Sequence, residues 1–343
     1  MTYSWRLLAV LASFAVAACG EDSPEPTSAP SGNQVQSTSQ VVAANTWAIR
    51  RGTLLPARAG AVAGAINGIV YLVGGYDGQG GNGFYAYLDA YDIAANTWTR
   101  KKPHPVPRGF ANGASAIGGK LYVTGGEKPT CTGSCSTFLA QTMFVYNPDN
   151  NTWTRKADMP FSGGYGAQGV IGGKLYVYLG AASRNVRFSH AFLRYNPATN
   201  TWANLALPPI NHPNGVGGVI NGKFYLAGGH GGHDDFRIGD LHVYNPATNT
   251  WTTKAPMSHP RRNAFGGVIN GKLYVAGGFD DFTDNLLSTE VYDPATDQWA
   301  DRADMQCTQS LGASAVASGR LFAIGGVDCN TFGVTRNLQV YTP

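Results

Sequence analysis

A tryptophan recurs about every fifty residues along this chain, and this period limits the possible folds more than any other feature. The tryptophans are Trp47, Trp98, Trp153, Trp202, Trp251 and Trp299. A tyrosine repeats with them at Tyr91, Tyr146, Tyr195, Tyr244, Tyr292 and Tyr341, and a diglycine precedes five of these tyrosines. Such a period indicates similar units that bury their apolar faces against their neighbours.

Each unit is predicted to contain four short strands. In the copy from Gly215 to Thr252, apolar runs at 216–220 and 223–227 are joined by Asn221-Gly222, and two more runs follow, the last around Trp251. Short runs of β-branched and aromatic residues, separated by Gly, Asn and Pro, are typical of strands. Asn-Gly is a hairpin signal because both residues tolerate positive φ. The unit is therefore an antiparallel meander.

The order of diglycine, tyrosine and tryptophan resembles the kelch repeat, which forms one blade of a β-propeller. The resemblance covers Val41 to Pro343 and implies an all-β, six-bladed propeller with four antiparallel strands per blade. Residues 41–47 match only a fourth strand, and residues 338–343 match only a third strand. We therefore expect the N-terminal strand to complete the last blade, which would leave no exposed sheet edge.

The first 18 residues predict a signal peptide. Arg6 precedes an apolar stretch at 7–18, which is too short to span a bilayer. The sequence Val16-Ala17-Ala18-Cys19 resembles the bacterial lipobox, in which the cysteine receives a lipid. The alternative is an ordinary secretory signal with a chance cysteine. In this family an aspartate directly after the cysteine retains the lipoprotein in the inner membrane, but here that residue is Gly20. The resemblance therefore implies an outer-membrane lipoprotein, periplasmic or at the cell surface.

Residues 19–40 are rich in Ser, Pro, Gln and Thr, and we expect a disordered tether there. The expected organisation is a signal peptide at 1–18, this tether, and the propeller at 41–343. Contact with the membrane is expected through the lipid only. The propeller is expected to be a monomer.

Charge and known motifs exclude several functions. The net charge is +4, and the lysines and arginines are scattered over the copies, so nucleic-acid binding is not expected. Neither a G-x-S-x-G elbow nor an H-E-x-x-H helix occurs. The glycines at 164, 166 and 169 match a dinucleotide pattern, but they open a strand that no helix follows. We expect no cofactor.

Four cysteines remain besides Cys19, namely Cys131, Cys135, Cys307 and Cys329. An even number in an exported protein favours disulfides. Cys131 and Cys135 share one loop, and the loops of Cys307 and Cys329 leave one end of the same blade, so these are the expected pairs. A zinc site formed by the four thiols is the alternative, but their blades are not neighbours.

The loops at one end of the propeller converge on the mouth of its central channel, where binding is expected. The position before the first strand carries Arg58, Arg108 and Arg261 in three repeats and His212 in another. In kelch proteins an arginine here often points to the channel mouth and can hold an acidic partner. The alternative is that each arginine caps loop carbonyls or pairs locally.

Three further residues are candidates for the mouth. Phe110 and Tyr165 are expected ligand contacts, and Glu127 is placed where a general acid or base can act. The loop at 230–235 contains two histidines and two aspartates, a possible divalent-metal site. Without a third anchoring element we interpret it as a polar loop, and no metal is expected.

Two classes of function remain. The preferred one is a lipid-anchored binding scaffold for a protein or a glycan. The alternative is a carbohydrate-active enzyme, such as an epimerase like the exported sialic acid mutarotases or an oxidase related to galactose oxidase. The ligands of the oxidase copper site cannot be matched here, and the fold alone supplies no activity.

Overall fold

Tight turns at glycine fold the repeats into hairpins, as the sequence predicts. Gly222 has φ of 72° after Asn221 at 48°, so both turn residues occupy the left-handed region. The computed structural model describes residues 44–343 except 51–55, 79–82, 130–136, 182–189, 232–235, 281–285, 329–330 and 332. Residues 42–343 form one compact unit.

All regular elements of the described residues are β-strands. Six of their sheets contain four antiparallel strands each. The first three are β2 (Val62–Ile66), β3 (Ile69–Val73), β4 (Leu88–Asp92) and β5 (Thr97–Arg100); β6 (Ala114–Ile117), β7 (Lys120–Thr124), β10 (Met143–Asn147) and β11 (Thr152–Arg155); and β12 (Ala167–Ile171), β13 (Lys174–Leu179), β14 (Ala191–Asn196) and β15 (Thr201–Asn204).

The other three four-stranded sheets follow the same order along the chain. They are β16 (Val216–Ile220), β17 (Lys223–Ala227), β20 (Leu241–Asn245) and β21 (Thr250–Lys254); β22 (Phe265–Ile269), β23 (Lys272–Ala276), β24 (Thr289–Asp293) and β25 (Gln298–Arg302); and β27 (Ala313–Ala317), β28 (Arg320–Ile324) and β31 (Leu338–Thr342) with β1 (Thr46–Ile49). Short strands lie in the connections: β8 (Glu127–Pro129), β9 (Thr137–Leu139), β18 (His230–Gly231), β19 (Phe236–Arg237), β26 (Gln309–Ser310), β29 (Val327–Asp328) and β30 (Gly333–Val334).

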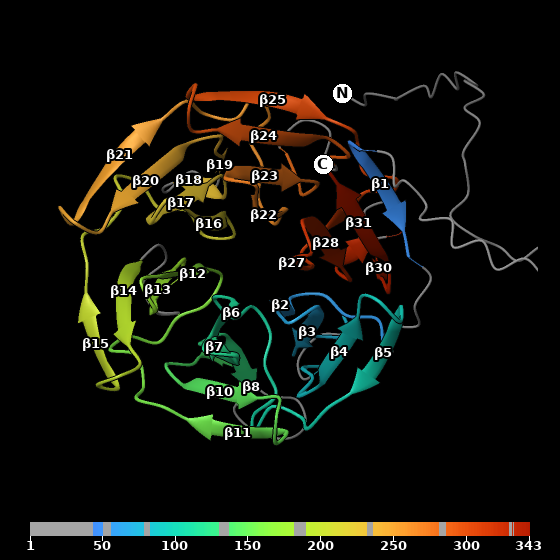
Figure 1. Ribbon diagram of the computed structural model, residues 1–343, viewed down its shortest axis with the longest axis vertical. Coiled ribbons are helices and arrows are strands. Elements are labelled where there is room, and N and C mark those ends of the chain that lie inside the picture. Colours follow the sequence, from blue (N-terminus) through green and yellow to red (C-terminus); the bar gives the residue numbers. More distant parts are fainter. Residues whose placement is uncertain are drawn as a thin grey trace, which may run out of the picture. The chain divides into compact units, whose positions relative to one another are not determined.

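One edge strand of each sheet lies nearest the centre of the unit, and in the sheet that contains β1 this inner strand is β27 (Figure 1). These inner strands contact one another in the cyclic order β2, β6, β12, β16, β22, β27 and again β2. The expected β-propeller is the fold observed. Within the described residues, no helix is long and apolar enough to cross a membrane.

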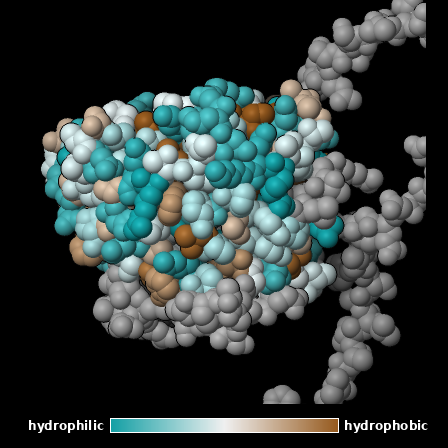
Figure 2. Space-filling model, turned by 90° about the horizontal axis from the view of Figure 1, so that it is seen from below, coloured by the Kyte–Doolittle hydropathy of each residue, from teal (hydrophilic) through white to brown (hydrophobic). Residues whose placement is uncertain are grey.

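Apolar side chains fill the space between neighbouring sheets. In one cluster Val70 and Leu72 of β3 pack with Phe322 and Ile324 of β28. The repeat tyrosines are at most 2% exposed, and they lie in such clusters. On the side drawn in Figure 2, hydrophobic residues are scattered among hydrophilic ones. Burial therefore joins each sheet to its neighbours.

A repeated polar clasp also joins adjacent sheets. The Tyr195 hydroxyl donates to Oδ1 of Asn200 at 2.7 Å, and the same oxygen accepts the backbone N–H of Ala157 at 3.0 Å. The indole N–H of Trp202 donates to the Ala157 carbonyl at 2.9 Å. Asn200 has φ of 55°, which asparagine tolerates better than most residues. The repeat tyrosine and tryptophan therefore hold one sheet to the next.

The N-terminal strand takes part in the same clasp. β1 pairs with β31 in antiparallel register, with Trp47 opposite Tyr341. Oδ1 of Asn45 accepts the Tyr341 hydroxyl at 2.8 Å and the backbone N–H of Ala303 at 2.9 Å. Asn45 thus makes the same two hydrogen bonds as Asn200, one to a repeat tyrosine and one to a backbone N–H from the preceding repeat.

Replacing Asn45 by alanine is expected to lower the free energy of unfolding by about 1–3 kcal/mol, because two donors lose their acceptor. Urea unfolding of Asn45→Ala against the unmodified protein measures this loss. Asn150→Ala is the matched control, since among the described residues Oδ1 of Asn150 accepts one solvent-exposed hydrogen bond, from the Thr152 hydroxyl, and a change within about 0.5 kcal/mol is expected. Equal stabilities of the two variants would show that β1 is not held by this clasp.

Candidate functional site

A circle of backbone hydrogen bonds surrounds one mouth of the central channel. Its members, each the residue at the entry to an inner strand, are Gly60, Phe110, Tyr165, Asn214, Asn263 and Leu311, with φ between 53° and 61°. Each backbone N–H donates to the carbonyl of the preceding member at 2.7–3.0 Å, and Gly60 donates to Leu311. We call these residues the mouth ring. Positive φ is unusual for bulky residues such as Phe110 and Tyr165, and such strain is frequent at functional sites.

The single glycine of the mouth ring makes room for its neighbour. A Cβ atom on Gly60 would lie 2.8 Å from the Phe110 ring. The Phe110 ring therefore extends over Gly60, and the Tyr165 ring in turn stacks on Phe110, with centroids 4.8 Å apart and planes inclined by 22°. The left-handed backbone aims both aromatic side chains along the ring.

Below the mouth ring lies a cavity of about 360 Å³. Its wall consists of the inner strands and their entries, and many of the lining residues are alanine or glycine. Phe110, Tyr165, Asn214 and Asn263 are among the lining residues. A volume of this size is within the range of small-molecule pockets.

Two more aromatic rings pack against Phe110 and form an aromatic wall beside it, although neither is among the residues that line the cavity. The Tyr76 ring lies 5.2 Å from Phe110, and Phe84 meets Phe110 edge-on at 6.5 Å, both measured between ring centroids. Tyr76 and Phe84 are functional-site residues that were not predicted from the sequence. Tyr76 follows a diglycine as Glu127 does, and this shared place in the repeat was the available signal.

Glu127 joins this aromatic wall. The Tyr165 hydroxyl donates to Oε1 of Glu127 at 2.8 Å, and Glu127 is 8% exposed. Backbone hydrogen bonds between Glu127 and Gly109 fix the strand that carries the carboxylate. The structure therefore brings together Phe110, Tyr165 and Glu127, three residues that the sequence suggested separately.

A basic group lies elsewhere around the mouth. Nη1 of Arg262 donates to Nε2 of His230, so the proton of the neutral His230 ring is on Nδ1. The Arg262 guanidinium lies 5.9 Å from the Phe279 ring centroid. Arg262 was not predicted from the sequence, although it adjoins Arg261. His233, Asp234 and Asp235 of the suggested metal loop lie outside the described residues.

The three arginines suggested from the sequence are buried within their own sheets. Arg58, Arg108 and Arg261 are at most 1% exposed. Arg108 donates from Nη1 to the Gly125 carbonyl at 2.5 Å, and burial lowers the pKa of Arg108 to about 9. Arg261 donates to the equivalent Gly277 carbonyl at 3.1 Å. This geometry corresponds to the local-capping alternative.

In five repeats the residue at this position, just before the first strand, faces the residue two places before the repeat tyrosine. The facing pairs are Arg58 with Asp89, Arg108 with Phe144, His212 with His242, Arg261 with Glu290, and Gln309 with Gln339. The two side chains of each pair are chemically matched: cation with carboxylate or aromatic face, imidazole with imidazole, amide with amide. We call them the buried facing pairs.

The histidine pair has defined tautomers. Nδ1 of His212 lies 2.7 Å from the Gly228 carbonyl, which can only accept, so Nδ1 carries the proton. Nε2 of His212 therefore accepts from Nδ1 of His242 at 2.8 Å. Burial lowers the pKa of His212 to about 3. His212 is thus neutral at physiological pH and belongs to the interior of its sheet.

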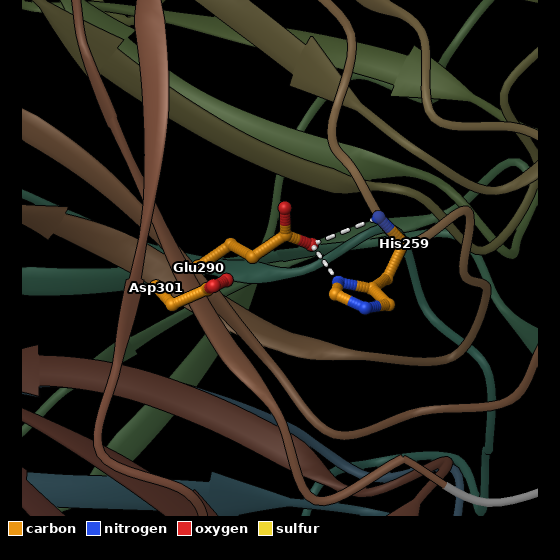
Figure 3. A group of neighbouring side chains, drawn as sticks. All are labelled: His259, Glu290 and Asp301. Carbon is orange, nitrogen blue, oxygen red and sulfur yellow. Dashed lines mark hydrogen bonds and ion pairs between the residues drawn. The ribbon is translucent and has the colours of Figure 1, made fainter.

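One group of side chains resembles a metal site by distance. The ligand atoms of His259, Glu290 and Asp301 lie within 4.8 Å of one another (Figure 3). However, the Glu290 carboxylate accepts the backbone N–H groups of Ser258 and His259 and lies 2.9 Å from Nη2 of Arg261. Because a positive charge already occupies this carboxylate, the group is an ion-pair network in a buried facing pair.

Several expectations fall outside the described residues. Residues 1–43, with Cys19, are among them, and so are Cys131, Cys135 and Cys329. Cys307 is described and buried. Both disulfides therefore stay predictions.

Family profiles match this chain over most of the propeller. The profile described as the KLHDC2/KLHL20/DRC7 Kelch-repeats domain matches residues 114–326, more than half of the chain. The profile described as the Kelch motif matches residues 57–105. The resemblance expected from diglycine, tyrosine and tryptophan is confirmed.

Curated relatives match over shorter stretches. Kelch-like protein 36 of Bos taurus is 29% identical over 120 residues, which are 35% of this chain and 19% of that protein. N-acetylneuraminate epimerase of Pasteurella multocida (strain Pm70) is 30% identical over 158 residues, which are 37% of this chain and 41% of that protein. The chain thus matches less than half the length of either relative.

A solved structure titled "Structure of YjhT" has the same fold. Its TM-score is 0.70 with 18% sequence identity, and the match covers 84% of this chain and 96% of that chain. At this identity the likeness concerns the fold alone.

The buried facing pairs predict a specific double-mutant result. Arg261→Gln or Glu290→Gln alone is expected to lower the free energy of unfolding by about 3–5 kcal/mol, because each leaves one buried charge without its partner. The double variant recreates the amide pair of Gln309 and Gln339, so it should regain at least about 1 kcal/mol over the sum of the single losses. Urea unfolding measures all three variants.

The exposed ion pair of Arg155 and Asp158 provides the control. Arg155→Gln should change stability by less than about 1 kcal/mol. Additive losses at Arg261 and Glu290 would contradict the matched-pair interpretation.

Proposed function

Because this chain belongs to the kelch-repeat family of β-propellers, we propose that it is an exported, lipid-anchored scaffold that binds a protein or a glycan at the mouth ring. One observation carries the proposal: stacked Phe110 and Tyr165 stand beside the Glu127 carboxylate at the opening of a cavity of about 360 Å³. Aromatic faces with a few placed polar atoms are typical of pockets that hold and orient a ligand.

The proposal includes a closed propeller of six blades, in which β1 supplies the fourth strand of the blade that starts at β27. The circular hydrogen bonding of the mouth ring and the clasp of Asn45 with Tyr341 support this closure. A closed circle leaves no sheet edge free to pair with other chains. It also holds the mouth residues at fixed separations, which a binding site needs.

The proposal further includes a signal peptide at 1–18, lipid on Cys19 and a tether at 19–40, in an outer-membrane lipoprotein. The support is the apolar stretch that ends in Val16-Ala17-Ala18-Cys19 and the polar composition that follows. Disulfides between Cys131 and Cys135 and between Cys307 and Cys329 are proposed for the exported protein.

A second candidate is a carbohydrate epimerase. The relative named N-acetylneuraminate epimerase, 30% identical over 158 residues, favours it. Tyr165 and Glu127 share a proton in a hydrogen bond at the mouth, and such a pair can give or take a proton in an acid–base step. Faster anomerisation of N-acetylneuraminate with the purified protein than without it, lost in Glu127→Gln, would favour this activity over binding alone.

Lipid attachment predicts a change of compartment. In a bacterial host, Cys19→Ser is expected to move the protein from the membrane fraction to the soluble fraction, because one thioether-linked lipid group is the proposed anchor. Mass spectrometry of the mature N-terminal peptide measures the lipid directly. An unmodified N-terminus on the unaltered protein would contradict the anchor and leave the mouth proposal standing.

The mouth proposal predicts a loss of binding without a loss of stability. Phe110→Ala and Tyr165→Ala should each weaken the tightest ligand found on a glycan array or in an envelope extract at least about tenfold, since each removes an aromatic contact. Leu207→Ala is the control, because Leu207 is 49% exposed and does not line the cavity. Unchanged affinity in both mouth variants, with Tm preserved, would contradict the proposal.

A further inference from the structure

Five of the six repeats begin their second strand with a basic residue, directly after the turn that follows the inner strand. The sixth repeat has Ile69 at this place. Because these second strands pair with the inner strands, basic residues about fifty apart in the sequence are arranged around the centre of the unit (Figure 1). We call them the basic ring: Lys120, Lys174, Lys223, Lys272 and Arg320.

The basic ring lies at the opposite end of the inner strands from the mouth ring. The inner strand β16 starts two residues after Asn214 of the mouth ring and ends at Ile220, which pairs with Lys223 across the turn. The other inner strands run in the same direction, because each starts beyond a mouth-ring residue and ends at the turn before the second strand. One face of the propeller therefore carries the mouth, and the opposite face carries the basic ring.

Within the described residues, most charges of the basic ring have no carboxylate partner. Lys120 and Lys223 are exposed, and Lys174 is half-buried. Of the five basic residues, Lys272 is the one that forms an ion pair there, with Oδ2 of Asp293 at 2.8 Å. The other four positive charges are therefore available to an external partner.

Carboxylates occur further from the centre, where the third strand of a sheet turns into the fourth. Asp92 accepts the backbone N–H groups of Ala94 and Ala95 at 2.9 and 3.0 Å. Asp297 lies 3.2 Å from Nζ of Lys254, and Asp293 pairs with Lys272. The turns beside the basic ring contain only glycine, asparagine and serine. Positive charge thus prevails around the centre of this face.

The chemistry of the basic ring suits an extended anionic surface. Lysine presents a compact, hydrated charge on a flexible stem, and it lacks the planar fork with which arginine holds a single ligand. The five residues stand on five different sheets, and none of them lines the cavity below the mouth ring. Charges of one sign spread over a face attract a surface of opposite charge, and each lysine close to anionic lipid headgroups strengthens the attraction.

We propose that the basic ring binds the anionic phospholipid headgroups of a membrane. This contact goes beyond the binding function proposed above and takes from it only the lipid on Cys19, which brings the chain to a bilayer. A lipid group together with a basic patch anchors a protein more stably than either one alone. With the basic ring against the headgroups, the mouth ring faces away from the bilayer and toward its ligand.

The test uses the full chain with Cys19→Ser, so that no attached lipid masks the contribution of the basic ring. Sedimentation with vesicles of phosphatidylglycerol and phosphatidylcholine in equal parts is compared with sedimentation with vesicles of phosphatidylcholine alone. Binding to the anionic vesicles is expected to be at least about tenfold tighter. This preference should decrease as salt is added, because salt screens the attraction.

A triple variant, Lys120→Gln with Lys174→Gln and Lys223→Gln, assigns the effect to the basic ring. It should bind the anionic vesicles at least about tenfold more weakly, since one lysine near anionic headgroups changes binding about fivefold. As single changes, Lys272→Gln should weaken binding less than Lys223→Gln, because Asp293 already pairs with Lys272.

The matched control is Lys101→Gln with Lys102→Gln and Lys156→Gln, which changes the net charge equally. These lysines lie in connections that lead from a fourth strand to a mouth-ring residue. Their loss should change binding to the anionic vesicles less than about twofold, because attraction is screened beyond a Debye length of about 10 Å. Thermal unfolding of each variant establishes that the fold is intact.

Three results would overturn the inference. Equal losses in the two triple variants would show that net charge, and not the basic ring, attracts the membrane. Equal binding to both kinds of vesicle would remove the anionic headgroup as the partner. Capture by heparin, a soluble polyanion, without binding to anionic vesicles would assign the basic ring a soluble acidic partner. None of these results bears on ligand binding at the mouth, which the variants of Phe110 and Tyr165 test separately.

Discussion

The architecture of the mouth depends on one circle of hydrogen bonds. Six residues, one at the entry to each inner strand, each donate a backbone N–H to the carbonyl of the preceding member, with distances of 2.7–3.0 Å. All six residues have a left-handed φ. For the bulky residues Phe110, Tyr165 and Leu311 this backbone conformation costs about 1 kcal/mol or more each. A strained backbone conformation persists only where surrounding contacts hold it, and here the circle of hydrogen bonds holds it. The same constraint stacks the Phe110 and Tyr165 rings on each other and places the Tyr165 hydroxyl within reach of Glu127.

A second set of contacts separates the scaffold from the site. In four of the buried facing pairs the first residue bonds the carbonyl that follows the second strand, whereas Arg58 bonds the Asp89 carboxylate. All three arginine side chains are therefore engaged in the interior. Burial of a guanidinium is favourable only with a matched partner, and Asp89, Phe144 and Glu290 provide it. The mouth ring is formed by the residues two places further along the chain.

The sequence predicted the scaffold well because its signals are local. Asn-Gly turns, the diglycines and the alternating apolar runs determine hairpins within each repeat, and the repeated tyrosine and tryptophan identify the contacts between sheets. The sequence alone did not determine whether the arginine side chains point to solvent or into the interior. Arg58 and its partner Asp89 are 31 residues apart, so no local pattern identifies the pair. Glu127 and Tyr165, 38 residues apart, meet only when neighbouring sheets are assembled. Positive φ at Phe110 and Tyr165 has no local signal, because neither residue favours it.

Native-state hydrogen exchange of the mouth-ring amides tests the central claim most directly. If the circle of hydrogen bonds holds the mouth, the N–H groups of Phe110, Tyr165, Asn214, Asn263 and Leu311 should exchange slowly and at similar rates, with opening free energies near that of global unfolding. Fast exchange at any of these amides, comparable with that of exposed turn residues such as Ala198, would contradict a closed circle and the binding site built on it.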